Sequence, residues 1–461
     1  MHDDPITSAF GDLDAGLFTT DPDLLAGLAH DESRLTDRAL PAGVLSPRST
    51  RDVADMARRA HAHGVPLVAR GAGSGLSGAA NAPAGSVVLR THRLASILEI
   101  DTVERLAVVQ PGVITADLRA AAREVGLFYP PDPGSVASCT VGGNVATDAG
   151  GMCCVKYGVT GDFVLGLEVV LADGTVVRTG RRTAKGVAGY DLTSLFVGSE
   201  GTLGIITEIT LRLLPAPAAA QTLVATFDRL NDAGRAVAAI ATSGLPVSML
   251  EIMDRTTLRA VDRRTGMGFD AGVAAMLLAQ ADDPAAAATV TALGELCASH
   301  GAGDVATSTD PEEAELLLEA RRQALPALEA LGDWLLDDVC VPRSRIVSLL
   351  EGVETIAAAE SLTIGVFGHA GDGNMHPTVI YDQSDPAGRA CAQRAFDAIT
   401  RLALDLGGTI TGEHGVGRLK TGWLAQELDP ATLALHRSVK DALDPSGILN
   451  PGAVLDAQTG R

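Results

Sequence analysis

The sequence predicts an α+β fold of two or three domains, from its size and from two patterns along the chain. With 461 residues, 46% of them hydrophobic, the chain can bury more than one core. A glycine-rich segment joins two predicted strands near the N-terminal end, and strands alternate with helices in the middle of the chain. The pattern Pro215-Ala-Pro217, followed by alanines, predicts the boundary between the two regions.

The N-terminal region is expected to begin with a helix and a pair of strands. Apolar residues recur at helical spacing over residues 49–63, Ser49 can cap this helix, and Gly64 can end it. Short extended segments over residues 65–69 and 86–89 flank the glycines. Further strands are predicted over residues 166–171, 176–178 and 204–213.

The middle region follows the order strand, helix, strand, strand, helix, which is typical of a ferredoxin-like layer. The expected elements span residues 222–227, 231–243, 247–253, 273–280 and 284–300. After them come a strand over residues 362–369, a helix with an apolar face from Ala395 to Leu406, and a stop at Gly407-Gly408.

Two glycine-rich stretches of the N-terminal region are candidates for ligand binding. The first, Gly73-x-Gly75-x-x-Gly78, has the form of a dinucleotide fingerprint, but that fingerprint requires a helix directly after it and none is predicted here. Such glycines either form a flexible turn or let successive backbone N–H groups approach a pyrophosphate. The second stretch, residues 130–158, is expected to be irregular throughout, because it is rich in glycine and proline and too long for an ordinary connection. Together the two favour a site for a phosphate group and a large planar ring.

Two histidines flank a predicted turn in the C-terminal half. In His369-Ala-Gly-Asp-Gly-Asn-Met-His376 a hairpin would bring both imidazoles to one ion, although residues seven apart on a continuous strand point to opposite faces. Glu413, after a short strand predicted over residues 409–411, can supply a carboxylate. Two histidines and a carboxylate suit Zn²⁺, Mn²⁺ or Fe²⁺ with open positions for substrate oxygens, and the adjacent His414 can then serve as a base. The alternatives are ordinary core or surface histidines and, for Glu413 and His414, a solvated turn.

The two glycine-rich stretches resemble those of the vanillyl-alcohol-oxidase type of FAD-linked oxidase. This resemblance implies an α+β architecture in which a two-part FAD-binding domain, residues 1–215, is followed by a ferredoxin-like substrate domain, residues 216–420. A C-terminal segment, residues 421–461, would return to the FAD domain. The residues that would contact the pyrophosphate are Gly71, Ala72, Gly73, Ser74, Gly75 and Gly78. Those that would line the ring and the ribityl chain are Pro131, Asp132, Gly134, Ser135, Thr140, Gly142, Gly143, Asn144, Gly150 and Gly158.

Two further segments resemble the same family. The segment Gly198-Ser-Glu-Gly-Thr-Leu-Gly-Ile-Ile206 implies adenine-side contacts from Gly201 and Ile206. Residues 444–451 resemble the family's tail, which reaches the flavin through Asn450. Some members attach the flavin covalently through a histidine at the position of Gly73, so FAD is expected to be bound here without a covalent link.

The two histidines, with the Gly-Glu-His-Gly sequence downstream, resemble the D-2-hydroxy-acid dehydrogenase branch, which includes D-lactate dehydrogenase, D-2-hydroxyglutarate dehydrogenase and the catalytic subunit of glycolate oxidase. The resemblance covers residues 47–454 and implies oxidation of a small D-2-hydroxy acid to the 2-oxo acid. A divalent metal, with zinc as the first candidate, would activate the hydroxyl, His414 would take its proton, and flavin N5 would receive the hydride. Arg321 would offset the charge of the substrate carboxylate. The family often shows a tryptophan shortly before this arginine, whereas this sequence has Leu317-Leu-Glu-Ala-Arg321-Arg322.

The composition disfavours several other classes of protein. A net charge of -21 and an aromatic content of 3% argue against nucleic acid as a partner. The six cysteines are scattered without a Cys-x-x-Cys pair, which fits a reducing compartment, and the N-terminus lacks the layout of a signal peptide. No uncharged apolar run reaches the length of a membrane helix. The sequence therefore predicts a cytoplasmic protein, with any attachment to a membrane made through a partner.

Two other functions stay open at the level of the sequence. One is a metal-dependent hydrolase whose glycine loops are only structural, which a lack of flavin absorbance would favour. The other is a non-catalytic FAD subunit of an electron-transfer complex. Because the chain has no cysteine-rich iron–sulfur signature, reduced flavin is expected to pass electrons to a quinone, a cytochrome, an electron-transfer flavoprotein or a separate iron–sulfur subunit. The particular hydroxy acid, the acceptor and assembly as a homodimer are open.

Overall fold

The computed structural model describes residues 4–33, 39–308 and 310–456. The chain divides into two compact units. The first unit is Met1–Gly150, Val159–Ala216 and His414–Arg461, and the second unit is Gly151–Gly158 and Pro217–Glu413. This division differs from the expected domains in three places: residues 151–158 group with the second unit, the main boundary follows Ala216, and the C-terminal part of the first unit begins at His414.

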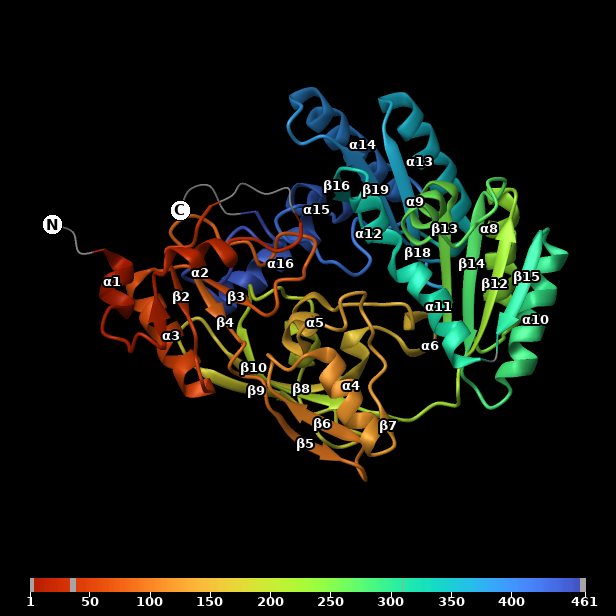
Figure 1. Ribbon diagram of the computed structural model, residues 1–461. Coiled ribbons are helices and arrows are strands. Elements are labelled where there is room, and N and C mark those ends of the chain that lie inside the picture. The colour runs from red at the N-terminus through yellow and green to blue at the C-terminus, as the bar shows by residue number, and fades with distance from the viewer. Residues whose placement is uncertain (1–3, 34–38, 309, 457–461) are drawn as a thin grey trace. The chain divides into compact units, whose positions relative to one another are not determined.

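The first unit opens with a small mixed sheet of strand order β1-β2-β4-β3 (Figure 1). Its strands are β1 (Phe18–Thr19), β2 (Gly43–Leu45), β3 (Leu67–Arg70) and β4 (Val87–Arg90). β1 is antiparallel to β2, whereas β2, β4 and β3 are parallel. The glycine-rich segment therefore joins two parallel neighbours, β3 and β4, and it does so without a helix.

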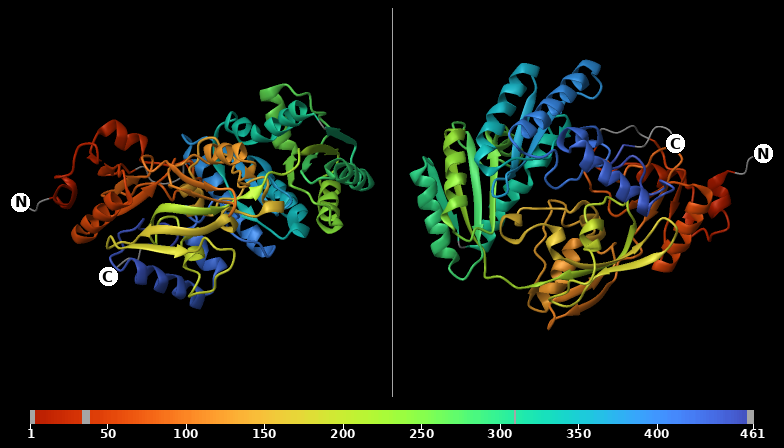
Figure 2. Two further views of the ribbon diagram at one scale, coloured as in Figure 1. Left: turned by 90° about the horizontal axis from the view of Figure 1, so that it is seen from below. Right: turned by 180° about the vertical axis from the view of Figure 1, so that it is seen from behind.

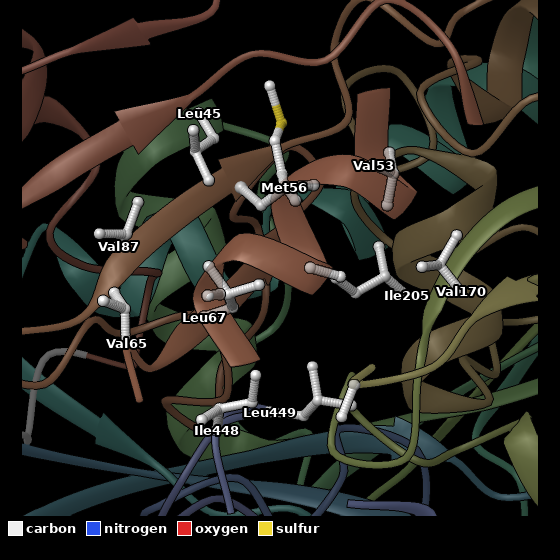
Figure 3. Packing of buried hydrophobic residues seen from close by; sticks show 14 of the residues in the cluster. Leu45, Val53, Met56, Val65, Leu67, Val87, Val170, Ile205, Ile448 and Leu449 are labelled. Carbon is white, nitrogen blue, oxygen red and sulfur yellow. The ribbon is translucent and has the colours of Figure 1, made fainter. Parts of the chain in front are cut away.

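The core of this part lies around helix α3 (Thr50–His63), which confirms the predicted helix. Val53 on its buried face belongs to one apolar cluster with Leu67 of β3 (Figure 3). Leu449, close to the C-terminal end of the described chain, belongs to the same cluster. The backbone N–H of Leu67 donates to the carbonyl of Ile448 at 2.7 Å. The tail of the chain therefore completes the core of the first unit.

The second sheet of the first unit is antiparallel, with the order β5-β6-β10-β8-β9. Its strands are β5 (Ile97–Asp101), β6 (Leu106–Val109), β8 (Val164–Val170), β9 (Val176–Gly180) and β10 (Ile205–Arg212). Buried and less buried residues alternate along β10, as in a strand with one covered face. The other elements are α1 (Pro5–Phe10), α2 (Pro22–Gly27), α4 (Thr115–Glu124), β7 (Leu127–Phe128), α5 (Val141–Thr147), η1 (Thr160–Phe163), α7 (Leu192–Phe196), β11 (Leu214–Pro215), α15 (Thr421–Glu427) and α16 (Pro430–Leu443).

The prediction that residues 130–158 are irregular throughout is wrong. They contain α5 and, in the second unit, the short helix α6 (Cys154–Tyr157). The hydroxyl of Thr140 caps α5 by accepting a backbone N–H one turn ahead at 3.2 Å. A side chain at Gly142 would overlap Pro111, so glycine here lets the helix pack closely against a neighbouring segment.

Gly142→Ala is therefore expected to destabilise the first unit, by about 1–3 kcal/mol, because overpacking outweighs the better helix propensity of alanine. The midpoint of unfolding in urea measures this effect. Gly27→Ala is the matched control, since no atom lies within 4 Å of the position of a Cβ there. A Gly142→Ala protein as stable as the Gly27→Ala protein would contradict the packing argument.

The second unit is built on one antiparallel sheet of order β15-β12-β14-β13-β18-β19-β16, with β17 also paired to β19. The strands are β12 (Gln221–Phe227), β13 (Met249–Asp254), β14 (Ala275–Ala281), β15 (Asp304–Ser308), β16 (Asp333–Leu336), β17 (Val339–Cys340), β18 (Thr363–His369) and β19 (Asn374–Tyr381). The helices are α8 (Leu230–Ser243), α9 (Arg255–Thr265), α10 (Ala286–Ser299), α11 (Pro311–Arg322), α12 (Ala324–Glu329), η2 (Arg343–Arg345), α13 (Ile346–Glu360) and α14 (Pro386–Asp405).

The first half of this sheet has the predicted ferredoxin-like topology. The chain order β12-α8-β13-β14-α10-β15 gives the spatial order β15-β12-β14-β13, with α9 inserted after β13. The second half repeats most of this pattern, as β16-α13-β18-β19-α14. β13 and β18, which hold equivalent places in the two halves, pair with each other and join them. α8 and α10 pack on the first half, and α13 and α14 on the second (Figure 1 and Figure 2).

Polar and apolar contacts hold residues 151–158 in the second unit. The hydroxyl of Tyr157 donates to Asp282 Oδ2 at 2.5 Å, and Lys156 forms an ion pair with the same carboxylate. Val155 packs so closely on Gly371 that a side chain there would overlap it. These contacts explain why this segment, predicted to belong with the N-terminal domain, groups with the second unit.

Candidate active site

Two histidines of the second unit lie on one face of its sheet. β18 ends at His369, β19 begins at Asn374, and the register pairs Phe367 with His376. Paired residues share a face and alternate residues of a strand return to it, so His369 and His376 lie on the same side. Their ring centroids are 5.2 Å apart and the rings are nearly perpendicular, at 85°. The predicted hairpin between the two histidines is confirmed.

Glu413 contacts both histidines with one carboxylate oxygen. Its Oε1 atom lies 3.1 Å from Nε2 of His369 and 3.3 Å from Nε2 of His376. The structure therefore brings together the three residues that were predicted as metal ligands. The prediction of a strand over residues 409–411 is wrong, because this segment forms only an isolated β-bridge, between Thr409 and Cys340.

Each histidine turns its other ring nitrogen toward a buried carboxylate. Nδ1 of His369 lies 2.7 Å from Oε1 of Glu251, and Nδ1 of His376 lies 3.6 Å from Oδ1 of Asp338. Both acidic residues are 1% exposed. A carboxylate on Nδ1 favours the tautomer that has its proton there, which leaves the lone pair on Nε2. Sequence analysis missed both acids, although each one stands next to apolar residues that a buried strand would contain.

Arg321 of α11 is bound to the same carboxylate as His369. Its Nε and Nη2 atoms each lie 2.7 Å from Oε2 of Glu251. Its guanidinium carbon lies 4.7 Å from the centre of the Phe367 ring, within the range of a cation–π contact. The structure therefore places Arg321 beside the histidine cluster, with its charge matched by that of Glu251.

Asp338 also holds the backbone that leads into Glu413. Its Oδ2 atom accepts the N–H groups of Gly412 and Glu413, both at 2.9 Å, and the hydroxyl of Thr411 at 2.8 Å. Its Oδ1 atom accepts an amide N–H of Asn374 at 2.7 Å. One carboxylate therefore contacts both the hairpin and the segment that carries the third predicted ligand.

Buried charges shift the pKa values of this cluster in opposite directions. Burial lowers the pKa of His369, but the charges of Glu251 and Glu413 outweigh it and raise that pKa well above its ordinary value. Burial raises the pKa of Glu413, but His369 and His376 hold that pKa well below its ordinary range. Without a bound cation, Glu413 is therefore ionised and His369 keeps a proton on Nε2 as well as on Nδ1, and a bound metal ion would displace the proton from Nε2.

These donors fit a divalent cation by their number and chemistry. The ligand atoms of His369, His376 and Glu413 all lie within 4.8 Å of one another. Two imidazoles and a carboxylate, with further carboxylates behind the imidazoles, are found at many zinc, manganese and iron sites. Three protein ligands leave coordination positions for oxygen atoms of a substrate.

In the first unit the two glycine-rich stretches pack against each other. A side chain at Gly71 would overlap Thr140, and Gly73 and Gly78 have φ angles of +80° and +81°. Such a loop can turn successive N–H groups toward a diphosphate. Gly158 belongs to the second unit. The other predicted FAD-contacting residues belong to the first unit: Ala72, Ser74, Gly75, Pro131, Asp132, Gly134, Ser135, Gly142, Gly143, Asn144, Gly150, Gly201, Ile206 and Asn450.

His414 begins the C-terminal part of the first unit and is joined to the first glycine loop. Its carbonyl accepts the hydroxyl of Ser77 at 3.0 Å, and the carbonyl of Ser77 accepts the N–H of Arg418 at 2.9 Å. A side chain at Gly417, where φ is +54°, would overlap the same carbonyl of Ser77. The predicted base therefore follows Glu413 directly in the chain and is fixed to the loop that was predicted to bind pyrophosphate.

Glu200 and Asn450 connect this segment to the rest of the first unit. The carboxylate of Glu200 accepts the N–H of Val416 at 2.8 Å and that of Gly417 at 2.9 Å. Asn450 donates to the carbonyl of Glu200 at 2.7 Å and to that of Ala79 at 2.9 Å. Asn450 thus lies next to the first glycine loop. Glu200 was not predicted as a site residue, although it stands inside one of the segments that resemble the family.

Glu200 gives the stability of the protein a pH dependence of known sign. Burial raises the pKa of Glu200 to about 7 from 4.5. Between these pH values the folded state keeps a proton that the unfolded state loses, so stability falls by about 1.4 kcal/mol per pH unit as the pH rises and then levels off. We expect the thermal midpoint of the wild type, relative to that of Glu200→Gln, to be lower at pH 7.5 than at pH 5. A constant difference across this range would contradict the assignment.

Comparison with known proteins assigns both parts of the chain to one family. The model of an FAD binding domain matches residues 41–180, and the model of the C-terminal domain of FAD linked oxidases matches residues 216–454. These matches define a flavin-dependent oxidoreductase with FAD as its cofactor. The chain belongs to the FAD-linked oxidases, and the resemblance to the D-2-hydroxy-acid branch of the vanillyl-alcohol-oxidase type is confirmed. A hydrolase with merely structural glycine loops is thereby ruled out.

Similar proteins extend over nearly the whole chain. The glycolate oxidase subunit GlcD of Bacillus subtilis is 42% identical over 90% of this chain and 89% of its own length. The mitochondrial D-lactate dehydrogenase (cytochrome) of Arabidopsis thaliana is 34% identical over 90% of this chain and 74% of its own length. The solved structure of p-cresol methylhydroxylase with substrate bound has a TM-score of 0.81 at 18% identity, and covers 99% of this chain and 97% of its own. That last likeness shows the fold alone.

Among the helices of the described residues, none combines the length and the apolar character that crossing a membrane requires.

Proposed function

We propose that this chain oxidises a small D-2-hydroxy acid, of the glycolate, D-lactate or D-2-hydroxyglutarate class, to the corresponding 2-oxo acid. The observation that carries the proposal is the convergence of His369, His376 and Glu413 in the second unit, with ligand atoms within 4.8 Å of one another. The names of the relatives, a glycolate oxidase subunit and a D-lactate dehydrogenase, support the substrate class.

His369, His376 and Glu413 would hold a divalent cation through two Nε2 atoms and one carboxylate. Zinc is the first candidate, and manganese and iron are the others. When bound, such an ion would fix the carboxylate and hydroxyl oxygens of the substrate and lower the pKa of the hydroxyl group. Glu251, at 2.7 Å from Nδ1 of His369, would keep that imidazole in the tautomer that this role requires, and the negative charge of Asp338, 3.6 Å from Nδ1 of His376, would favour the same tautomer there.

His414 would serve as the general base that takes the hydroxyl proton. Consecutive Cα atoms are about 3.8 Å apart, so the chain itself keeps His414 close to the ligand Glu413. The hydrogen bond from Ser77 fixes the backbone of His414 to the first glycine loop. When bound, FAD would supply the acceptor for the two electrons and the Cα hydrogen that the substrate loses, and His414 would take the proton that the hydroxyl group releases as its C–O bond becomes a carbonyl.

Arg321 would offset the negative charge of the substrate. Its contact with Glu251 makes the pair neutral, so the buried carboxylate behind His369 does not add to the charge that an anionic substrate meets. This matters in a chain whose net charge is -21. Arg321 would therefore reduce the repulsion that the substrate carboxylate meets, either by direct contact with it or by neutralising Glu251.

The FAD is proposed to be bound without a covalent link. The position at which some family members carry the linking histidine is Gly73 in this sequence. Flavin that stayed with the protein after acid precipitation would contradict this. The reduced flavin would pass its electrons to an external quinone, cytochrome, electron-transfer flavoprotein or iron–sulfur subunit. We propose that the enzyme is cytoplasmic. Whether it assembles as a homodimer is open.

A substrate panel tests the proposed function directly. Purified holoenzyme is assayed with D- and L-lactate, glycolate, and D- and L-2-hydroxyglutarate, with an artificial dye as electron acceptor, before and after removal of metal by a chelator. We expect activity with at least one D acid or glycolate, little with the L enantiomers, loss on chelation and recovery with Zn²⁺, Mn²⁺ or Fe²⁺. Activity that chelation leaves unchanged would remove the metal from the proposal, and a lack of activity with every acid would remove the substrate class.

A further inference from the structure

The carboxylate of Asp338 lies beside two of the three proposed ligands, His376 and Glu413. Oδ1 lies 3.6 Å from Nδ1 of His376, while Oδ2 accepts the backbone N–H of Glu413 at 2.9 Å. Asp338 is 1% exposed, so these contacts are made away from water. We propose that Asp338 is a positioning residue that sets both the tautomer of His376 and the path of the backbone into Glu413. This inference rests on the proposed metal site.

The first effect of Asp338 concerns the proton on His376. A neutral imidazole binds a metal ion only through the nitrogen that carries no proton, which for His376 is Nε2 if the proton stays on Nδ1. The negative charge of Asp338 next to Nδ1 favours this tautomer. An asparagine at position 338 would keep its oxygen toward the three donors on the Oδ2 side, which directs its NH₂ group toward Nδ1 of His376 and toward the Asn374 amide that now donates to Oδ1. His376 would then carry its proton on Nε2 and lose its place as a ligand.

The second effect concerns three donors that converge on Oδ2. The hydroxyl of Thr411 donates at 2.8 Å, and the N–H groups of Gly412 and Glu413 donate at 2.9 Å. Three consecutive residues therefore wrap around one oxygen atom, which fixes the direction in which the Glu413 side chain leaves the backbone. Gly412 fits this arrangement, because a side chain there would overlap the amide of Asn374. A neutral acceptor in place of the carboxylate would hold this segment less tightly.

The neighbouring Asp337 offers a matched control. It is 0% exposed, and its Oδ2 atom accepts the hydroxyl of Thr400 on α14 at 2.9 Å. Asp337→Asn therefore also weakens a buried hydrogen bond next to β16. The Oδ1 atom of Asp337 accepts the backbone N–H of Asp338 at 2.9 Å, and because an asparagine oxygen can accept the same bond, Asp337→Asn leaves in place the side-chain contacts of Asp338 with His376 and the Glu413 segment. A general loss of stability would appear in both variants, whereas a change at the proposed metal site would appear only in Asp338→Asn.

The experiment compares wild type, Asp338→Asn and Asp337→Asn as full-length holoenzymes. FAD content is measured by flavin absorbance, metal content by elemental analysis, and coordination by the visible spectrum after replacement of the metal with Co²⁺. We expect all three proteins to retain FAD, and Asp338→Asn alone to lose about 10–100-fold in metal affinity and to change its cobalt spectrum. Asp338→Asn with the metal affinity and cobalt spectrum of Asp337→Asn would overturn the inference while leaving the proposed function intact.

Two further outcomes keep the test decisive. If wild type itself binds no metal, both the inference and the metal-dependent function fail together. If Asp338→Asn does not fold, Asp338→Glu takes its place, because it keeps the charge but displaces the oxygens by one carbon–carbon bond. Reduced metal affinity in Asp338→Glu would support the inference, and wild-type affinity in this variant would count against it.

Discussion

His414→Ala is expected to lower turnover by orders of magnitude while leaving FAD and metal in place. Removal of a general base costs about 100- to 10,000-fold in rate, because no other group then takes the hydroxyl proton. The side chain can be removed without loss of the contact between His414 and the glycine loop, since Ser77 binds its backbone carbonyl. Steady-state kinetics with the best substrate, together with flavin and metal content, measures the effect.

The control for this variant is His436→Ala, since His436 is an exposed residue of α16 and lies outside the proposed site. It should keep the activity of the wild type. Near-normal turnover of His414→Ala would assign the proton transfer to another group. Loss of FAD from His414→Ala would show instead that the imidazole supports the cofactor.

His376→Ala is expected to remove the metal and, with it, almost all activity. One imidazole and one carboxylate would then remain to bind the ion. Loss of a residue that only hydrogen-bonds a ligand lowers metal affinity by up to roughly 100-fold, and loss of the ligand itself should lower it further. Activity should drop to that of chelated wild type. FAD content should not change, because His376 belongs to the second unit and all the predicted FAD-contacting residues except Gly158 belong to the first.

His300→Ala serves as its control. His300 is a partly buried histidine of the same unit, at the end of α10, and its Nδ1 lies 2.8 Å from the carbonyl of Leu296. Metal content and turnover should match those of wild type. Should His376→Ala bind metal as wild type does, the three side chains would have to be explained as a structural hydrogen-bond cluster.

Periodic patterns predicted the regular parts of the fold well. The apolar spacing of residues 49–63 and the Gly64 stop gave α3 within one residue, because a helix that buries one face needs that spacing. The glycine-rich segment of residues 130–158 was misjudged for a physical reason. In α5 glycine is required by the close approach to Pro111, and a tertiary contact of this kind leaves no mark on local sequence.

The candidate site was predictable where the residues stand close together in sequence. His369 and His376 flank a turn of four residues, so their convergence follows from the hairpin. Glu251 and Asp338 could not be placed, because only the pairing of β13 with β18 and of β17 with β19 brings them to the histidines. Two acids among buried apolar residues were the available signal, since a buried carboxylate nearly always has a partner.

The burial of Ile448 and Leu449 beside Leu67 affects how this protein is made. Residues 1–216 are synthesised long before the tail of the chain. Until the tail is made, the hydrophobic core of the first unit is incomplete, and the hydrogen bonds from Asn450 to Ala79 and Glu200 are missing. We therefore expect stable FAD binding only after the tail has been synthesised. A chain that terminates before Ile448 would leave the ribosome without the segment that completes the core of the first unit.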